Sequence, residues 1–180
     1  MKIFSTKKTK LKIRNKFFYS VQPFDVIIKI PFFFIFSFIN SKPKINKLVI
    51  EKTTNPLPKP NDPKLPFGKY STDHIFEAEW EQGKGWSTPY IKPYHNLVLD
   101  PKASVFHYGL EIFEGLKAYY DIHGKIRIFR PDLNMKRFNK SADRLALPTI
   151  DEKGVLEGIK QLLKLDISWF PKELGIISFF

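Results

Sequence analysis

One stretch in the second half of the chain constrains the fold more than any other. Two short runs rich in strand-forming residues, 116–120 and 125–129, flank a turn in which Gly124 can supply the positive φ of a tight hairpin. Pro131 then suits the first turn of a helix. Apolar residues recur after it at helical spacing, namely Leu133, Met135, Phe138, Ala142 and Leu145. A hairpin that leads directly into an amphipathic helix predicts a mixed α/β domain.

Further elements are expected on both sides of this unit. The alternation of polar and apolar residues predicts a strand over 72–80, and 90–93 and 96–99 read as two shorter extended segments. Thr149 and Glu152 have the spacing of a capping box, which predicts the start of a last helix. The apolar stripe of that helix consists of Val155, Leu156, Ile159, Leu162 and Leu163.

The positive charge lies mainly in the first 50 residues. The whole chain has a net charge of +12, but residues 1–50 hold 11 Lys/Arg and a single acid, Asp25, so the rest is close to neutral. Because nucleic-acid binding needs basic side chains displayed on an ordered face, this distribution argues against a nucleic-acid-binding domain. The apolar run from Val26 to Ile39 is interrupted by Lys29 and Pro31 and falls short of the ~20 residues that span a bilayer.

Residues 1–50 are therefore expected to be a disordered, basic, Phe-rich extension. Their composition is compatible with a mitochondrial targeting segment and equally with translated AT-rich non-coding sequence, and the location of the protein, mitochondrial or cytoplasmic, stays open. Residues 51–66 contain five prolines between Asn55 and Pro66 and are expected to form a stiff linker. The chain has no cysteine, and its histidines lack metal-ligand spacing, so no metal site is expected.

Two motifs carry a family resemblance. They are the run from His107 to Tyr119 (HYGLEIFEGLKAY) and the run from Phe129 to Arg137 (FRPDLNMKR). Together with Phe67-Gly68-Lys69, these motifs resemble the branched-chain amino acid aminotransferases, which are pyridoxal phosphate enzymes of fold type IV. The resemblance covers residues 67–171 and implies the N-terminal small domain of that fold, an α+β domain like that of D-amino acid aminotransferase. Residues 172–180 depart from the pattern.

The resemblance also implies roles for particular residues. Arg137 matches the arginine that binds the phosphate of the cofactor, whereas its spacing alone would favour a solvated helix face. Phe67, Tyr108 and Phe113 match residues that line the pocket for the branched side chain of the substrate. Gly115, in a motif shared across fold type IV enzymes, is expected to allow a close approach of the backbone.

The implied activity is transfer of the amino group of leucine, isoleucine or valine to 2-oxoglutarate by a homodimer with pyridoxal 5'-phosphate. The lysine that would hold this cofactor covalently is expected beyond residue 180, so no catalytic residue is assigned within the chain. Exposed apolar surface is expected where a large domain would pack.

Two alternatives stay open. The chain could be an inactive fragment that acts only by binding or dimerising with intact subunits. It could also be a membrane-surface protein held by its basic, Phe-rich extension.

Overall fold

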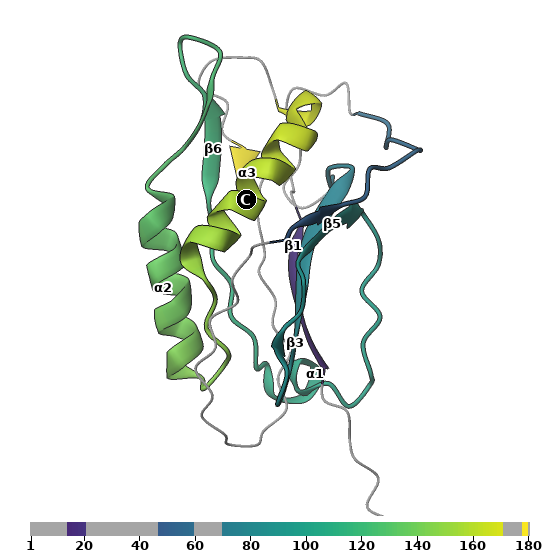
Figure 1. Ribbon diagram of the computed structural model, residues 1–180, viewed down its shortest axis with the longest axis vertical. Coiled ribbons are helices and arrows are strands. Elements are labelled where there is room, and N and C mark those ends of the chain that lie inside the picture. The colour runs from purple at the N-terminus through teal and green to yellow at the C-terminus, as the bar shows by residue number, and fades with distance from the viewer. Residues whose placement is uncertain (1–13, 21–46, 60–69, 171–177, 180) are drawn as a thin grey trace, which may run out of the picture.

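The computed structural model describes residues 14–20, 47–59, 70–170 and 178–179 of the 180-residue chain. In this part of the chain, two β-sheets and three α-helices form a mixed α/β domain, as the sequence predicted (Figure 1). Phe67 and most of the basic extension lie outside the described residues.

The first sheet is built around β3 (His74–Glu81). This strand pairs antiparallel with β1 (Arg14–Ser20) on one side and with β5 (Tyr90–Pro93) on the other. Beyond β5, the two-residue β2 (Val49–Ile50) pairs in parallel, and β4 (Gly85–Trp86) folds back onto the end of β3. Pairing of β1 with β3 differs from the expected disordered extension, because it places residues 14–20 in the sheet.

The predicted hairpin is confirmed in the second sheet. It consists of β6 (Lys117–Tyr120) and β7 (Ile126–Ile128), and Gly124 in the turn has a φ of 68°. The short β8 (Ser178–Phe179) pairs with the other edge of β6. Residues 96–99, which we expected to be an extended segment, belong to no strand, and the chain continues from β5 as a loop to the short α1 (Ser104–Tyr108).

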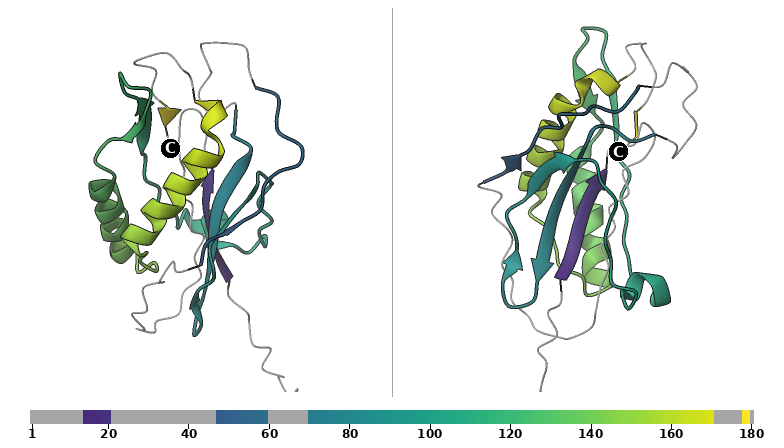
Figure 2. Two further views of the ribbon diagram at one scale, coloured as in Figure 1. Left: turned by 45° about the horizontal axis from the view of Figure 1, so that its top comes forward. Right: turned by 90° about the vertical axis from the view of Figure 1, so that its right-hand side faces the viewer.

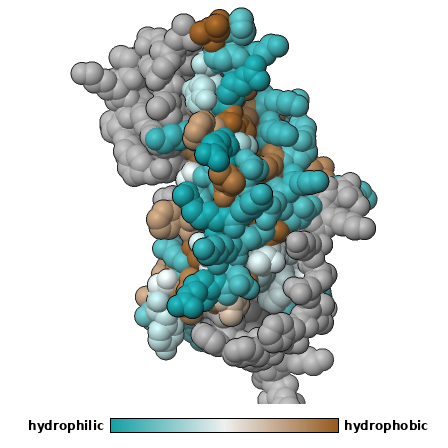
Figure 3. Space-filling view, turned by 90° about the vertical axis from the view of Figure 1, so that its left-hand side faces the viewer, coloured by the Kyte–Doolittle hydropathy of each residue, from teal (hydrophilic) through white to brown (hydrophobic). Residues whose placement is uncertain are grey.

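Two longer helices complete the domain and match the predicted helices. They are α2 (Pro131–Arg144) and α3 (Glu152–Leu165), which leads into a 3₁₀ turn at Ile167–Trp169. Figure 2 shows α3 lying between the first sheet and α2, and the helix contacts both β3 and α2. The outer face of the molecule on the α2 side is mostly hydrophilic, with some apolar groups along its middle (Figure 3).

The expected capping box does not form at the start of α3. The helix begins after Asp151, whose side chain makes no capping hydrogen bond. Glu152 instead accepts a hydrogen bond from the Nδ2 of Asn139 on α2, at 3.1 Å. Asn139 also exchanges hydrogen bonds with both backbone groups of Ile150, so its amide holds the loop that joins the two helices.

Close packing of α3 on the first sheet depends on Gly158. A Cβ atom at this position would lie 2.5 Å from the ring of Phe76, which is fully buried on β3. A contact this short is not tolerated in a packed core, so glycine is the residue that lets the helix approach the strand.

Among the described residues, no helix has the length and apolar character needed to cross a membrane. The same part of the chain holds no group of three or more side chains placed to bind a metal ion.

Candidate functional site

The predicted phosphate-binding residue, Arg137, is part of a cluster around a buried carboxylate. That carboxylate belongs to Glu114, which is only 3% exposed and lies in the segment just before β6. Arg137 and Asn134 are one helical turn apart on α2, so both side chains can reach the same point beside the helix. The fold thus brings together residues 20 or more positions apart in the sequence.

Glu114 is held by four hydrogen bonds. Arg137 donates from Nε to Oε2 at 2.6 Å and from Nη2 to Oε1, a two-point ion pair. Oε1 also accepts from Nδ2 of Asn134, at 3.1 Å, and from the amide of Gly115, at 3.0 Å. Asn134 binds the carbonyl of Gly115 as well, at 2.8 Å. Both carboxylate oxygens are therefore satisfied, as burial of a charge requires.

This arrangement favours the charged forms of both partners. Burial raises the pKa of the Glu114 carboxyl, but the hydrogen bonds from Arg137 and Asn134 and the charge of Arg137 outweigh it, so the pKa lies below its usual value. The hydrogen bond and the charge of Glu114 in turn raise the pKa of Arg137. The pair is thus ionised over the whole neutral range.

Arg137 is open on its other side. Its side chain is 68% exposed although its partner is buried. The pair uses Nε and Nη2, and none of the described residues accepts a hydrogen bond from Nη1. A guanidinium held by one edge with its remaining donors in solvent can bind an anion such as a phosphate.

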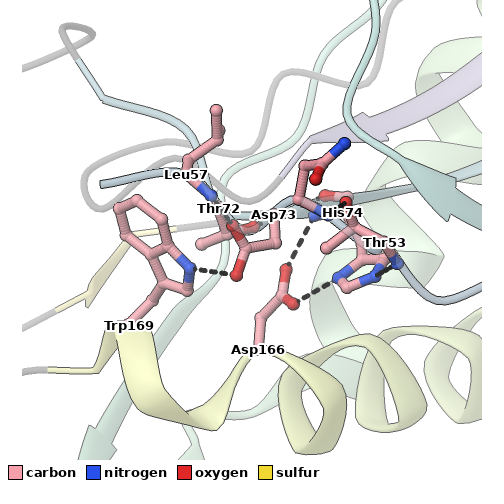
Figure 4. A network of polar contacts seen from close by, with 8 residues as sticks. Thr53, Leu57, Thr72, Asp73, His74, Asp166 and Trp169 are labelled. Atoms are coloured by element: carbon pink, nitrogen blue, oxygen red, sulfur yellow. Dashed lines mark hydrogen bonds and ion pairs between the residues drawn. The ribbon is translucent and has the colours of Figure 1, made fainter. Parts of the chain in front are cut away.

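A second buried carboxylate, Asp166, anchors a different cluster at the end of α3 (Figure 4). Its oxygens accept from the backbone amide of His74, at 3.1 Å, and bind the ring Nδ1 of His74, at 2.6 Å. The other ring nitrogen, Nε2, accepts from the amide of Thr53, at 2.9 Å, which places the ring proton on Nδ1. His74 and Asp166 are both buried, so within the described part of the chain neither side chain is open to a ligand.

Asp73 extends this cluster toward the neighbouring segments. One of its carboxylate oxygens accepts from the amide of Leu57, at 2.6 Å, and the other from the indole of Trp169, at 2.9 Å. Residues 51–59, which we expected to be a linker leading into the domain, are therefore hydrogen-bonded to it. His74 is thus a buried structural residue of this cluster.

Comparison with known proteins identifies relatives of part of the chain. No protein-family model matches the chain. It is 51% identical over 132 residues to a branched-chain-amino-acid aminotransferase of Dictyostelium discoideum, covering 73% of this chain and 35% of that protein. Branched-chain-amino-acid transaminase 1 of Bacillus subtilis is 49% identical over 132 residues, which are 73% of this chain and 37% of the relative. The chain is a partial homologue of the branched-chain-amino-acid aminotransferases.

The cytosolic branched-chain-amino-acid aminotransferase of Saccharomyces cerevisiae is 54% identical over 118 residues, or 66% of this chain and 31% of that enzyme. The chain thus spans about a third of the length of the aminotransferases it matches. Relatives are named as cytosolic in yeast and as mitochondrial in cattle, so the family occurs in both compartments.

The structure places two of the pocket residues implied by the aminotransferase resemblance on the surface. Tyr108, at the end of α1, is 79% exposed, and Phe113 is 74% exposed. Phe106 and Val98 are exposed in the same part of the chain. Within the described residues, Tyr108 and Phe113 are not enclosed in a pocket, and the third residue, Phe67, lies outside them.

The close approach expected at Gly115 is not found among the described residues. A Cβ atom there would meet none of their heavy atoms within 4 Å, and the φ of this residue is not in the left-handed region. What Gly115 contributes to the cluster is its backbone, because its amide and carbonyl bind Glu114 and Asn134.

Sequence reasoning missed Glu114 as the partner of Arg137. A signal was present, because an acid between Ile112 and Leu116, two residues that pack in the core, has to find a cation when it is buried. The partnership of Asp166 with His74 gave no such signal, since the two residues are 92 positions apart.

Proposed function

We propose that this domain is the small domain of a fold type IV, pyridoxal phosphate-dependent branched-chain-amino-acid aminotransferase. The whole protein would act as a homodimer and transfer the amino group of leucine, isoleucine or valine to 2-oxoglutarate. The observation that carries this proposal is an identity near 50% over about 130 residues with aminotransferases from an amoeba and a bacterium.

In this proposal Arg137 binds the phosphate group of the cofactor. The residues present fit that group, because the guanidinium has donors in solvent and is fixed from behind by Glu114. Two parallel hydrogen bonds from a planar fork of donors suit phosphate oxygens. Bound pyridoxal phosphate supplies the carbonyl group and the electron-withdrawing ring that transamination needs, and the work of Arg137 is to bind and orient it.

Tyr108 and Phe113 contribute apolar surface to the substrate pocket in this proposal, with Phe67. Their exposure supports the idea that another part of the enzyme covers them. Transfer of a branched aliphatic side chain from water to such a pocket is worth about 1.5–3 kcal/mol. Because one methylene changes binding by only ~1–3 kcal/mol, all three branched-chain amino acids are expected to be used.

The proposal can be tested without knowing the length of the gene product. An epitope tag inserted in the chromosomal gene after His123, in the exposed turn of the hairpin, leaves the strands intact. Protein captured through this tag is assayed for glutamate formation from 2-oxoglutarate with leucine, isoleucine or valine, and with alanine as the control amino donor. We expect activity with the three branched-chain amino acids that exceeds activity with alanine.

A second tagged strain separates this proposal from the binding-only alternative. It carries Arg137→Ala in the same gene, and we expect the captured protein to lose activity. If the captured protein is inactive in both strains, the proposal fails. If activity is present and Arg137→Ala leaves it unchanged, the captured chain acts only by binding intact aminotransferase subunits.

A further inference from the structure

The position of Arg137 depends on more than its own backbone. Arginine has a long, flexible side chain, and on an exposed helix face it samples many rotamers. Here the guanidinium meets a carboxylate that cannot move, because Glu114 is buried and is itself held by Asn134 and by the amide of Gly115. Two bonds to one fixed carboxylate determine the orientation of the guanidinium plane as well as its location.

Charge alone would make Glu114 a poor neighbour for an anion site. Its negative charge offsets that of Arg137 and weakens the attraction of the pair for phosphate. Burying a carboxylate at this place is therefore of no electrostatic benefit to an anion ligand. The benefit of Glu114 is geometric. It binds the Nε and Nη2 edge of the Arg137 guanidinium and leaves the edge at Nη1 for a ligand.

We propose that Glu114 is the positioning residue for Arg137, which it holds by one edge so that the opposite edge meets the phosphate group of the ligand. This inference rests on the proposed role of Arg137 in phosphate binding. It extends that role to a residue that touches no ligand. Asn134 supports the same arrangement, because it binds both the Glu114 carboxylate and the carbonyl of Gly115, in the segment just before β6.

The test compares two variants that make the same chemical change. Glu114→Gln removes a negative charge behind Arg137, and Asp121→Asn removes one behind Arg127, an exposed arginine whose Nε binds Asp121 at 2.8 Å. The full 180-residue chain is titrated with inorganic phosphate, and binding is followed by the NMR shift of the Arg137 Nε–H group. Arg137→Ala, followed by backbone amide shifts of α2, reports whether the site itself exists.

If Glu114 positions Arg137, Glu114→Gln weakens phosphate binding by roughly tenfold, the scale on which supporting residues act at other binding sites. Asp121→Asn leaves the affinity unchanged. If Glu114 is only a nearby charge, its removal strengthens phosphate binding, which is the opposite sign and overturns the proposal. If the Arg137→Ala variant binds phosphate with wild-type affinity, Arg137 does not form the phosphate site. The proposed function of Arg137 is then wrong, and so is the positioning role of Glu114.

A measurement on the unmodified chain covers the case in which Glu114→Gln does not fold. Rotation about the Nε–Cζ bond of Arg137 is expected to be several-fold slower than that of Arg144, which is exposed on the last turn of the same helix. Equal rotation rates for the two arginines would show that Glu114 does not hold the guanidinium, and they would overturn the proposal without any substitution.

Discussion

The clusters around Asp166 and Glu114 each satisfy a buried carboxylate, but they differ in how exposed its main partner is. Each has a carboxylate that is at most 3% exposed and in which both oxygens take part in hydrogen bonds. Asp166 binds His74, which is also buried, and the ring of His74 uses both nitrogens inside the domain. Glu114 binds Arg137, which is mostly in solvent.

The difference teaches how one kind of interaction can hold a fold together or hold a residue for a ligand. In the Asp166 cluster both ring nitrogens of His74 are bonded within the domain. The hydrogen bonds of this cluster therefore stabilise the contacts among β3, the end of α3 and the segment before β3. In the Glu114 cluster both carboxylate oxygens accept hydrogen bonds, whereas Arg137 donates to Glu114 only through Nε and Nη2. Stability should therefore depend mainly on the first cluster and ligand binding on the second.

The largest effect is expected for Asp166→Ala. The change leaves the backbone amide and the ring N–H of His74 without acceptors in the core, and hydrogen bonds to a charged group are worth about 1.5–3 kcal/mol each. We expect a loss of about 3 kcal/mol or more in the free energy of unfolding, measured by pulse proteolysis in urea at low protein concentration. The matched control is Asp143→Ala on the exposed face of α2, which should stay within about 0.5 kcal/mol of the wild type.

Arg137→Met should cost less, about 1–2 kcal/mol in the same assay. The methionine keeps the apolar stem, and Glu114 keeps its bonds from Asn134 and Gly115, but the buried carboxylate loses its cation. Arg127→Met breaks the exposed pair with Asp121, which solvent screens, and should cost less than Arg137→Met. If Arg137→Met lowered the free energy of unfolding as much as Asp166→Ala, the Glu114 cluster would contribute as much to stability as the Asp166 cluster, which would contradict our expectation.

A smaller effect is expected from pH. The pKa of Glu114 is lowered in the folded state, so the folded state binds fewer protons and its stability rises with pH through this transition. The contribution of Glu114 is complete above its usual pKa of 4.5 and is lost as the pH falls through the lower, folded value. The free energies of unfolding of the wild type and of Glu114→Gln should therefore converge as the pH falls below 4.5. A difference between them that does not change with pH would contradict this.

The smallest effect on stability is expected at the exposed aromatic residues. Tyr108→Ser and Phe113→Ser remove side chains that are more than 70% exposed, so each should change the free energy of unfolding by no more than about 0.5 kcal/mol. In the tagged gene product the same substitutions should raise the KM for leucine more than that for alanine. A large loss of stability would mean that these rings pack inside the domain rather than facing a partner surface.

Local patterns were enough to predict the elements whose signals lie within a few residues. The turn at Gly124, the helix after Pro131 and the apolar stripe of α3 were all found in this way. Residues 96–99, expected to be extended, join neither of the two described sheets, because an extended segment becomes a strand only when a neighbouring strand pairs with it. The capping box failed for a similar reason, since Asn139 on another helix takes Glu152 as its partner.

The site could be predicted only in part. The resemblance selected Arg137, Tyr108 and Phe113, and their roles stay predictions. Glu114 could have been inferred from its apolar neighbours, but the choice of Arg137 as its partner depends on how β6 and α2 meet. The pairing of Asp166 with His74 depends on how the end of α3 meets β3, and short-range pattern does not encode it.

The bonds of Asp73 have a consequence for how distant parts of the chain are held together. Its two carboxylate oxygens bind Leu57, in the segment between β2 and β3, and Trp169, in the turn that follows α3. One carboxylate thus cross-links two segments that are far apart in the sequence. A change at Asp73 would therefore loosen both contacts together, and the end of α3 and the segment before β3 would lose the same anchor.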